Sequence, residues 1–167
     1  MQLLNTDEFV SPIGTMVIFS DENALCHLDF KDCQDRISRL LTRRYQTFQL
    51  AKKANVLNMR DRLAEYFAGN WTAFENLPLE TGGTEFQQKV WRQLRKIPRG
   101  KTISYAELAN AIGQPSAVRA VASANARNPL SIIIPCHRVI GSDGSLTGYA
   151  GGVPRKDWLL RHEQALQ

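Results

Sequence analysis

The stretch Leu130-Ser-Ile-Ile-Ile-Pro-Cys-His-Arg-Val-Ile-Gly141 organises the C-terminal half of the chain. Its apolar run, residues 130–134, predicts a buried strand or extended segment. The run ends at Pro135, which has no N–H group to offer to a strand pair. Directly after it come Cys136, His137 and Arg138. A buried segment that ends in a thiol beside an imidazole could present a nucleophile. A free cysteine is also a common small core residue, so the Cys-His pair alone does not decide between the two interpretations.

The composition is that of a globular protein of one or two domains. The chain has 167 residues, of which 43% are hydrophobic. No apolar run approaches the roughly 18 residues that a membrane-spanning helix needs. The first eight residues lack the basic and apolar pattern of a signal peptide, so we expect a cytoplasmic protein. Three cysteines without paired Cys/His spacing predict neither a disulfide framework nor a metal site.

Charge is distributed unequally between the two halves. Residues 1–83 carry 9 Lys and Arg against 11 Asp and Glu, a net charge of −2. Residues 84–167 carry 12 against 5, a net charge of +7. The positive half could bind a polyanion such as nucleic acid, or it could simply have a basic, soluble surface.

The N-terminal half predicts a small α+β domain. Strands are expected near Leu3 and over residues 14–20, and alternating apolar residues over 24–30 predict a half-buried strand with Cys26 on its core face. Helical spacing follows over residues 33–45 and 56–67. We find no chemistry in this half. The Pro and paired Gly of residues 77–83 suit a linker between a domain at 1–76 and another at 84–167.

The C-terminal half begins with two helix-start signals. Thr84 with Gln87, and Ser104 with Glu107, each have the spacing of a capping box. After a glycine at position 113, Ser116 is expected to be the N-cap of a further helix. Two short helices joined by such a turn are typical of a helix-turn-helix.

The second helix of this pair is rich in alanine and contains one long charged residue, Arg119. Helices that contact bases in the major groove usually carry several long polar side chains. A nearly bare surface favours either close approach to a narrow groove, with Arg119 reaching into the duplex, or tight packing inside the domain. The sequence leaves both open.

Two further features lie near the C-terminus. Glycines flank an aromatic in Gly148-Tyr-Ala-Gly-Gly152, as in a loop that approaches a ligand or in an ordinary surface loop. A last helix is expected from Pro154. Glu163 shares its face with Leu159 and Leu160, so its carboxylate needs a partner, which spacing does not identify.

The segment Ile134-Pro-Cys-His-Arg-Val139 resembles the active-site motif of the O6-alkylguanine-DNA alkyltransferases, also called methylated-DNA–protein-cysteine methyltransferases. The resemblance covers essentially all of residues 84–163 and, more weakly, the N-terminal half. It is carried by residues 84–91, 103–109, 119–121, 148–152, 156–160 and 162–163. It implies an α+β protein of two domains: an RNase-H-like α/β domain with a small antiparallel sheet, and a mostly helical, winged helix-turn-helix-like domain.

The same resemblance implies a chemistry. Cys136 would accept the alkyl group of O6-alkylguanine, and of O4-alkylthymine, from double-stranded DNA in a single turnover without a cofactor. Glu163 would orient His137, which would take the thiol proton through a water. Tyr105 would protonate the departing base, and Asn128 would hold the turn before the cysteine. The protein is expected to act as a monomer.

The resemblance also implies a binding surface. The alanine-rich helix would enter the minor groove and flip the damaged nucleotide, with Arg119 taking its place in the stack. The other expected DNA contacts are Ser116, Ala117, Ala122, Ser123 and Ala126. Tyr105 would also line the base pocket, together with Val139, Tyr149 and Ala150. Many family members have glycine where this chain has Ala122, and serine where it has Ala150.

Two other functions fit parts of the sequence. A cysteine hydrolase with a Cys-His-Glu triad would turn over, but has no use for the alanine-rich helix with its arginine. A protein that only recognises damaged DNA would have no use for an acceptor such as Cys136.

Overall fold

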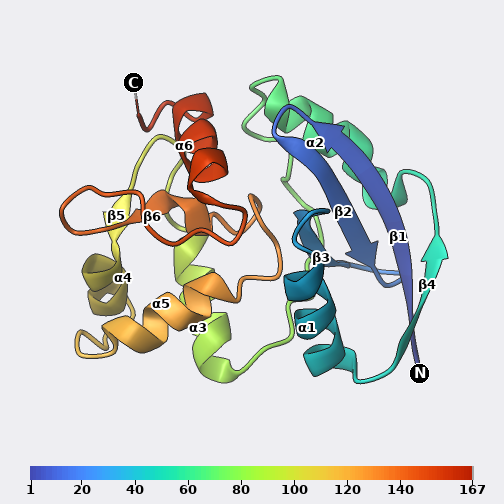
Figure 1. Ribbon diagram of the computed structural model, residues 1–167, viewed down its shortest axis with the longest axis horizontal. Helices are drawn as coiled ribbons and strands as arrows, with labels where there is room; N and C mark the ends of the chain where they lie inside the picture. Colours follow the sequence, from blue (N-terminus) through green and yellow to red (C-terminus); the bar gives the residue numbers. More distant parts are fainter. Residues whose placement is uncertain (167) are drawn as a thin grey trace. The chain divides into compact units, whose positions relative to one another are not determined.

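The computed structural model describes residues 1–166 and divides the chain into two compact units, Met1–Gly82 and a second unit from Gly83 onward (Figure 1). The first unit combines a sheet with two α-helices, and the second is mostly helical. The α+β fold class predicted from the sequence is confirmed.

A four-stranded sheet forms the centre of the first unit. Its strands are β1 (Gln2–Ser11), β2 (Gly14–Ser20), β3 (Leu25–Phe30) and β4 (Phe48–Lys52), in the order β3-β2-β1-β4. The pairs β1–β2 and β2–β3 are antiparallel, whereas β1 and β4 are parallel. The sheet is therefore mixed and larger than the sequence predicted, because β4 carries only a short apolar pattern.

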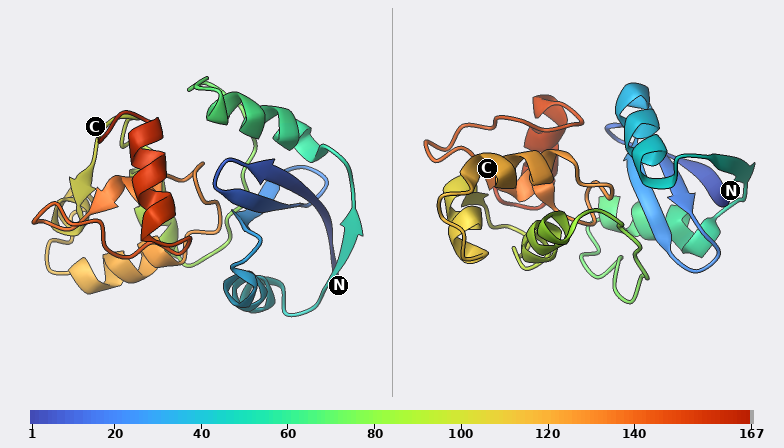
Figure 2. Two further views of the ribbon diagram at one scale, coloured as in Figure 1. Left: turned by 45° about the horizontal axis from the view of Figure 1, so that its top comes forward. Right: turned by 90° about the horizontal axis from the view of Figure 1, so that it is seen from below.

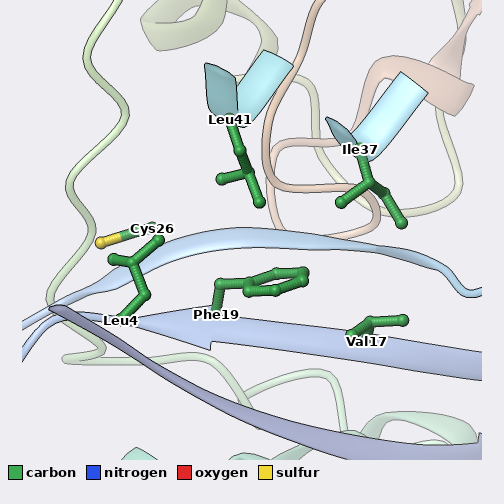
Figure 3. Packing of buried hydrophobic residues seen from close by; sticks show 6 residues of the cluster. All are labelled: Leu4, Val17, Phe19, Cys26, Ile37 and Leu41. Carbon is green, nitrogen blue, oxygen red and sulfur yellow. The ribbon is translucent and has the colours of Figure 1, made fainter. Parts of the chain in front are cut away.

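The two helices of this unit cover opposite faces of the sheet (Figure 2). Helix α1 (Gln34–Tyr45) packs on one face, in a cluster made of Leu4, Val17, Phe19, Cys26, Ile37 and Leu41 (Figure 3). On the other face, Phe67 of α2 (Met59–Phe67) stacks on Phe9 of β1, with 6.1 Å between ring centroids. A 3-10 turn, η1 (Val56–Asn58), precedes α2, so the single helix predicted over 56–67 is split by left-handed residues.

Strand β3 differs from the half-buried strand predicted for it. All six residues are buried, because a helix layer covers each face of the sheet. The register shifts opposite Phe19 and Ser20, and this bulge brings Cys26 into the α1-side cluster. The buried Asp29 is compensated by His27 at 3.3 Å and by Arg36 of α1. Burial of Cys26 is thus confirmed, although the alternation is not.

The second unit contains helices and a two-stranded parallel sheet. The elements are α3 (Glu85–Leu94), β5 (Ile103–Ser104), α4 (Tyr105–Ala111), α5 (Val118–Ala126), the 3-10 turn η2 (Cys136–Arg138), β6 (Val139–Ile140) and α6 (Val153–His162). Both predicted capping boxes are present, at Thr84 with Gln87 and at Ser104 with Glu107. They fix the starts of α3 and α4.

Two predictions for this unit are wrong. Ser116 is not an N-cap: α5 has Ala117 at that position, without a side-chain cap bond, and Ser116 is exposed. Residues 130–134 are buried as expected but form turns instead of a strand. Their hydrogen bonds are local, such as Ile134 N–H to the Leu130 carbonyl at 2.9 Å, and Ile132 has a left-handed φ of 74°.

Candidate active site

Cys136 begins η2 at the end of this buried turn and is 6% exposed. Asn128, which is completely buried, holds the turn from inside. Its amide nitrogen donates to the Ile134 carbonyl at 2.7 Å, and its amide oxygen accepts from the Leu130 N–H at 2.9 Å. Both ends of the amide are used, so the backbone that leads to the cysteine is fixed.

A buried carboxylate lies beside the histidine that follows the cysteine. Glu163, the C-cap of α6, accepts a hydrogen bond from His137 Nε2 at 2.9 Å. Arg138 donates to both carboxylate oxygens, through Nε at 2.8 Å and Nη2 at 3.0 Å. Its Nη1 donates to the Ile97 carbonyl at 2.7 Å. The side chains of His137 and Glu163 have no exposed surface.

The electrostatics of this group determine where the protons lie. Burial lowers the pKa of His137, and the Glu163 carboxylate only partly offsets this effect. Burial alone would raise the pKa of Glu163, but His137 and Arg138 bring it well below its ordinary value. The carboxylate is therefore ionised and the imidazole neutral. An ionised carboxylate can only accept hydrogen bonds, so His137 carries its proton on Nε2.

The other ring nitrogen, His137 Nδ1, is buried and has no hydrogen-bond partner among residues 1–166. In the tautomer just assigned, this atom has a free lone pair. A neutral imidazole held by a carboxylate through one nitrogen is suited to act as a base through the other.

Lys156 on α6 is a second buried cation, which the sequence analysis missed. Its ammonium group donates to the Val139 carbonyl at 2.5 Å and to the Thr147 carbonyl at 3.0 Å. Burial lowers the pKa of Lys156 to about 8, although Cys136 favours its charged form. Lys156 therefore lies within electrostatic reach of the thiol. Its spacing of seven residues from Glu163, on the same helix face as Leu159 and Leu160, was a usable signal.

Tyr105, the first residue of α4, contacts the loop that follows β6 through its phenol. The hydroxyl donates to the carbonyls of Thr147 and Gly148 at 3.3 and 3.5 Å. Burial raises the pKa of Tyr105, and the neighbouring Cys136 adds to this effect. The loop that contains Thr147 therefore lies against this phenol, which the charge of Cys136 influences.

The other residues expected in the base pocket, Val139, Tyr149 and Ala150, differ in burial. Val139 is fully buried, and the ring of Tyr149 meets the His137 ring edge-on at 6.5 Å. Ala150 is exposed on the loop. The structure thus brings Cys136, His137 and Glu163 into one region with Val139 and Tyr149.

Helix α5 has one packed and one open face. Val121, Ala124 and Asn125 are buried, and Trp91 of α3 donates its indole N–H to the Ala124 carbonyl at 2.9 Å. The open stripe contains Arg119, Ala122, Ser123 and Ala126, at the i, i+3, i+4 and i+7 positions of one helix face. Ala117, just before the helix, is partly exposed. Alanine therefore serves both tight packing and a bare surface, the two interpretations that the sequence left open.

Residues 1–166 contain neither a cluster of metal ligands nor a membrane-spanning helix. No three His, Cys, Asp or Glu side chains gather as metal ligands would. No helix in that range is long and apolar enough to span a bilayer.

Comparison with known proteins covers both units. The family model described as "6-O-methylguanine DNA methyltransferase, ribonuclease-like domain" matches residues 9–81, and the corresponding "DNA binding domain" matches residues 85–165. The methylated-DNA–protein-cysteine methyltransferase of Salmonella typhimurium is 45% identical over 98% of this chain and 97% of its own. The constitutive enzyme of Bacillus subtilis is 45% identical over 92% of each. The crystal structure of Mycobacterium tuberculosis OGT in complex with DNA has a TM-score of 0.80 and 40% identity, and covers 98% of this chain and 93% of that one.

Proposed function

The chain belongs to the methylated-DNA–protein-cysteine methyltransferase family, which repairs alkylated DNA directly, and we propose that Cys136 is the residue that accepts the alkyl group. The observation that supports this assignment is the buried group of His137, Glu163 and Arg138 directly after a cysteine on a fixed turn. The substrates proposed are O6-alkylguanine and O4-alkylthymine in double-stranded DNA. We propose a cytoplasmic monomer.

Activation of the thiol comes first in this mechanism. A thiol attacks an alkyl carbon only as thiolate, so it must lose its proton to a base. His137 Nδ1 takes that proton through a bridging water, and the ionised Glu163 stabilises the imidazolium that results. Arg138 keeps Glu163 ionised, and Lys156 adds positive charge near the thiolate.

Transfer then exchanges one bond for another. The sulfur forms a bond to the alkyl carbon, and the bond from that carbon to O6 breaks, with its electron pair passing to the guanine. Tyr105 gives a proton to a ring nitrogen, so guanine leaves neutral. The product is a thioether, which neither water nor a thiol cleaves. Each molecule therefore acts once, and the reaction requires no cofactor.

Access to the substrate requires the damaged nucleotide to leave the stack. We assign this step to α5, whose exposed stripe offers a nearly bare surface to the minor groove and one arginine, Arg119. Ser116 and Ala117, which precede the helix, would lie beside the backbone. In Ala122 the chain keeps a methyl group at the centre of the stripe, which limits how closely the groove can approach.

The decisive experiment is mass spectrometry of the protein after incubation with a duplex that contains one O6-methylguanine. The expected result is a gain of one methyl group, mapped by peptide analysis to Cys136 and absent from Cys136→Ala, which should still fold and bind DNA. A methyl group on Cys26 or Cys33 would refute the assignment. Binding without modification, or turnover of another substrate, would refute the mechanism.

A further inference from the structure

Helix α6 ends directly at the buried carboxylate of Glu163, which is its C-cap. The N–H of Gln164 donates to the Arg161 carbonyl at 3.0 Å, and the N–H of Ala165 donates to the Leu160 carbonyl at 2.8 Å. These two bonds form a Schellman motif, which stops a helix by means of a left-handed residue after the C-cap. Gln164 is that residue, with a φ of 67°.

A left-handed conformation is unfavourable for a residue with a side chain, because its Cβ crowds the backbone. Helices α2 and α4 avoid this cost with glycine at the same position, Gly69 with a φ of 95° and Gly113 with a φ of 76°. Helix α6 has Gln164 there instead. The end of α6 therefore depends on contacts from outside the helix more than the ends of α2 and α4 do.

Arg99 provides such contacts from the turn that follows α3. Its Nη1 donates to the Glu163 carbonyl at 3.1 Å and to the side-chain oxygen of Gln164 at 3.2 Å. The turn packs against the helix end, since a Cβ added at Gly100 would lie 3.5 Å from the Glu163 carbonyl oxygen. One guanidinium group thus holds both the C-cap carbonyl and the side chain of the left-handed residue.

The turn over residues 97–101 is itself attached to the active site. Arg138 donates to the Ile97 carbonyl through Nη1 at 2.7 Å, while its Nε and Nη2 hold the Glu163 carboxylate. Glu163 is therefore held in two ways from the same side. Arg138 fixes its carboxylate, and Arg99 fixes its backbone.

We propose that Arg99 is a positioning residue for alkyl transfer: it holds the left-handed end of α6 closed, so that the Glu163 carboxylate stays at hydrogen-bond distance from His137. This inference rests on the proposed function, in which Glu163 stabilises the imidazolium of His137. Arg99 acts through the backbone of Glu163 and not on the reacting atoms. A displacement of about 1 Å at an active site can cost about a hundredfold in rate, so a helix end that loosens part of the time has a measurable effect.

The test is a double-mutant cycle between Arg99 and Gln164. The rate of methyl transfer is measured as a function of pH at a saturating concentration of duplex with one O6-methylguanine, so that DNA affinity does not enter. Arg99→Met should lower the rate at neutral pH by about fivefold to tenfold, part of what a 1 Å displacement can cost. The rise of the rate with pH should also move to higher pH, because a loosened carboxylate stabilises the imidazolium less.

Gln164→Gly should restore both the rate and the pH dependence in the Arg99→Met background, because glycine adopts the left-handed conformation without support. The double variant still lacks the cation, so this rescue excludes an effect of charge alone. Arg99→Lys keeps the charge and a donor for the Glu163 carbonyl, and should retain most of the rate. Lys101→Met removes an exposed cation from the same turn and is the matched control, with rate and pH dependence unchanged.

A purely structural Arg99 would lower the free energy of unfolding in Arg99→Met and leave the rate and its pH dependence in place, and that result would overturn the proposal. Failure of Gln164→Gly to rescue Arg99→Met would overturn it as well. If Arg99→Met does not fold, Gln164→Val replaces it, because a β-branched residue strongly disfavours the left-handed conformation. Equal rates for Gln164→Val and Gln164→Gly would then refute the role of the helix end.

The two levels of the argument remain separable. Absence of methyl transfer by the wild-type protein would refute the proposed function. Equal transfer by the wild-type protein and Arg99→Met at every pH would refute only the role of Arg99.

Discussion

Arg138 and Glu163, which are 25 positions apart in the sequence, form a bidentate ion pair with N–O distances of 2.8 and 3.0 Å. The carboxylate is fully buried, whereas 13% of the arginine side chain is exposed. Removing one partner of a buried pair leaves an uncompensated charge, which typically costs about 3–5 kcal/mol. The pair therefore supports both the site and the stability of the second unit.

We predict that Arg138→Met lowers the free energy of unfolding by about 3–5 kcal/mol, because the buried Glu163 carboxylate loses the two hydrogen bonds and the charge of Arg138. The double variant Arg138→Met/Glu163→Gln should recover part of this loss, since neither charge of the pair remains. Urea denaturation measures both. The matched control is Arg161→Met, which breaks an exposed pair with Asp157 and should cost about 0.5 kcal/mol or less. Equal losses for Arg138→Met and Arg161→Met would contradict the prediction.

Glu163→Gln should slow alkylation of Cys136 by about ten- to a hundredfold at neutral pH, the size of effect known for loss of a carboxylate that orients a metal-bound histidine. The change removes the charge that stabilises the imidazolium, so the thiolate should form only at higher pH. The rise of the alkylation rate with pH should therefore move to higher pH. Asp157→Asn on the same helix is the control. An unchanged rate and profile in Glu163→Gln would exclude this carboxylate from the mechanism.

Stability should also fall in mild acid. Burial lowers the pKa of both His27 and His137 in the folded protein. As pH falls below about 6.5, the unfolded chain therefore takes up protons that the folded chain does not. Each histidine contributes up to about 1.4 kcal/mol of lost stability per pH unit in this window.

Urea titrations at pH 7.5, 6.5 and 5.5 test this expectation. Unfolding of the first unit is followed by its Trp71 and unfolding of the second unit by its Trp91. His27→Gln should reduce the change of unfolding free energy with pH for the first unit and leave that of the second unit as it is. Stability that does not change over this window would show that neither histidine gains protons on unfolding.

The features that the sequence predicted well are local ones. The capping boxes at Thr84 and Ser104 depend on residues three apart, so their pattern is visible in the sequence itself. The burial of residues 130–134 also follows from composition. Their turn conformation does not, because it depends on Asn128 bonding across six residues to Ile134.

The features that the sequence did not predict depend on distant segments. His27 and Asp29 are buried because α1 covers their face of the sheet, and alternation within β3 cannot show this. Only the family resemblance indicated that His137 is a partner of the Glu163 carboxylate. Arg138, although part of the quoted motif, was not predicted to be its second partner. No spacing rule connects positions 138 and 163. The pairing became visible only in the folded unit.

The last prediction concerns Arg119, the long cationic side chain on the exposed stripe of α5. If Arg119 fills the space that the flipped nucleotide leaves, Arg119→Ala should impair repair within a duplex. Unstacking a base costs a few kcal/mol. Loss of part of that compensation should slow duplex repair by about one to three orders of magnitude, at roughly 1.4 kcal/mol per factor of ten. The free base O6-methylguanine leaves no gap to fill, so its rate should hardly change.

The measurement is the alkylation rate of Arg119→Ala on duplex DNA and on the free base, each relative to the wild-type protein. Arg127→Ala is the matched control, because Arg127 also extends from α5 but is held by Ser123 on the same helix.

An arginine that only contacts phosphate behaves differently: its loss weakens binding to damaged and undamaged duplex alike and lowers the salt dependence by about one unit. That result, with the saturated repair rate intact, would make Arg119 a phosphate contact. Equal loss on duplex and free base would instead indicate damage to the site around Cys136. Arg119 occupies the space of the flipped nucleotide only if Arg119→Ala loses alkylation rate on duplex DNA, at saturating DNA, and keeps its rate on the free base.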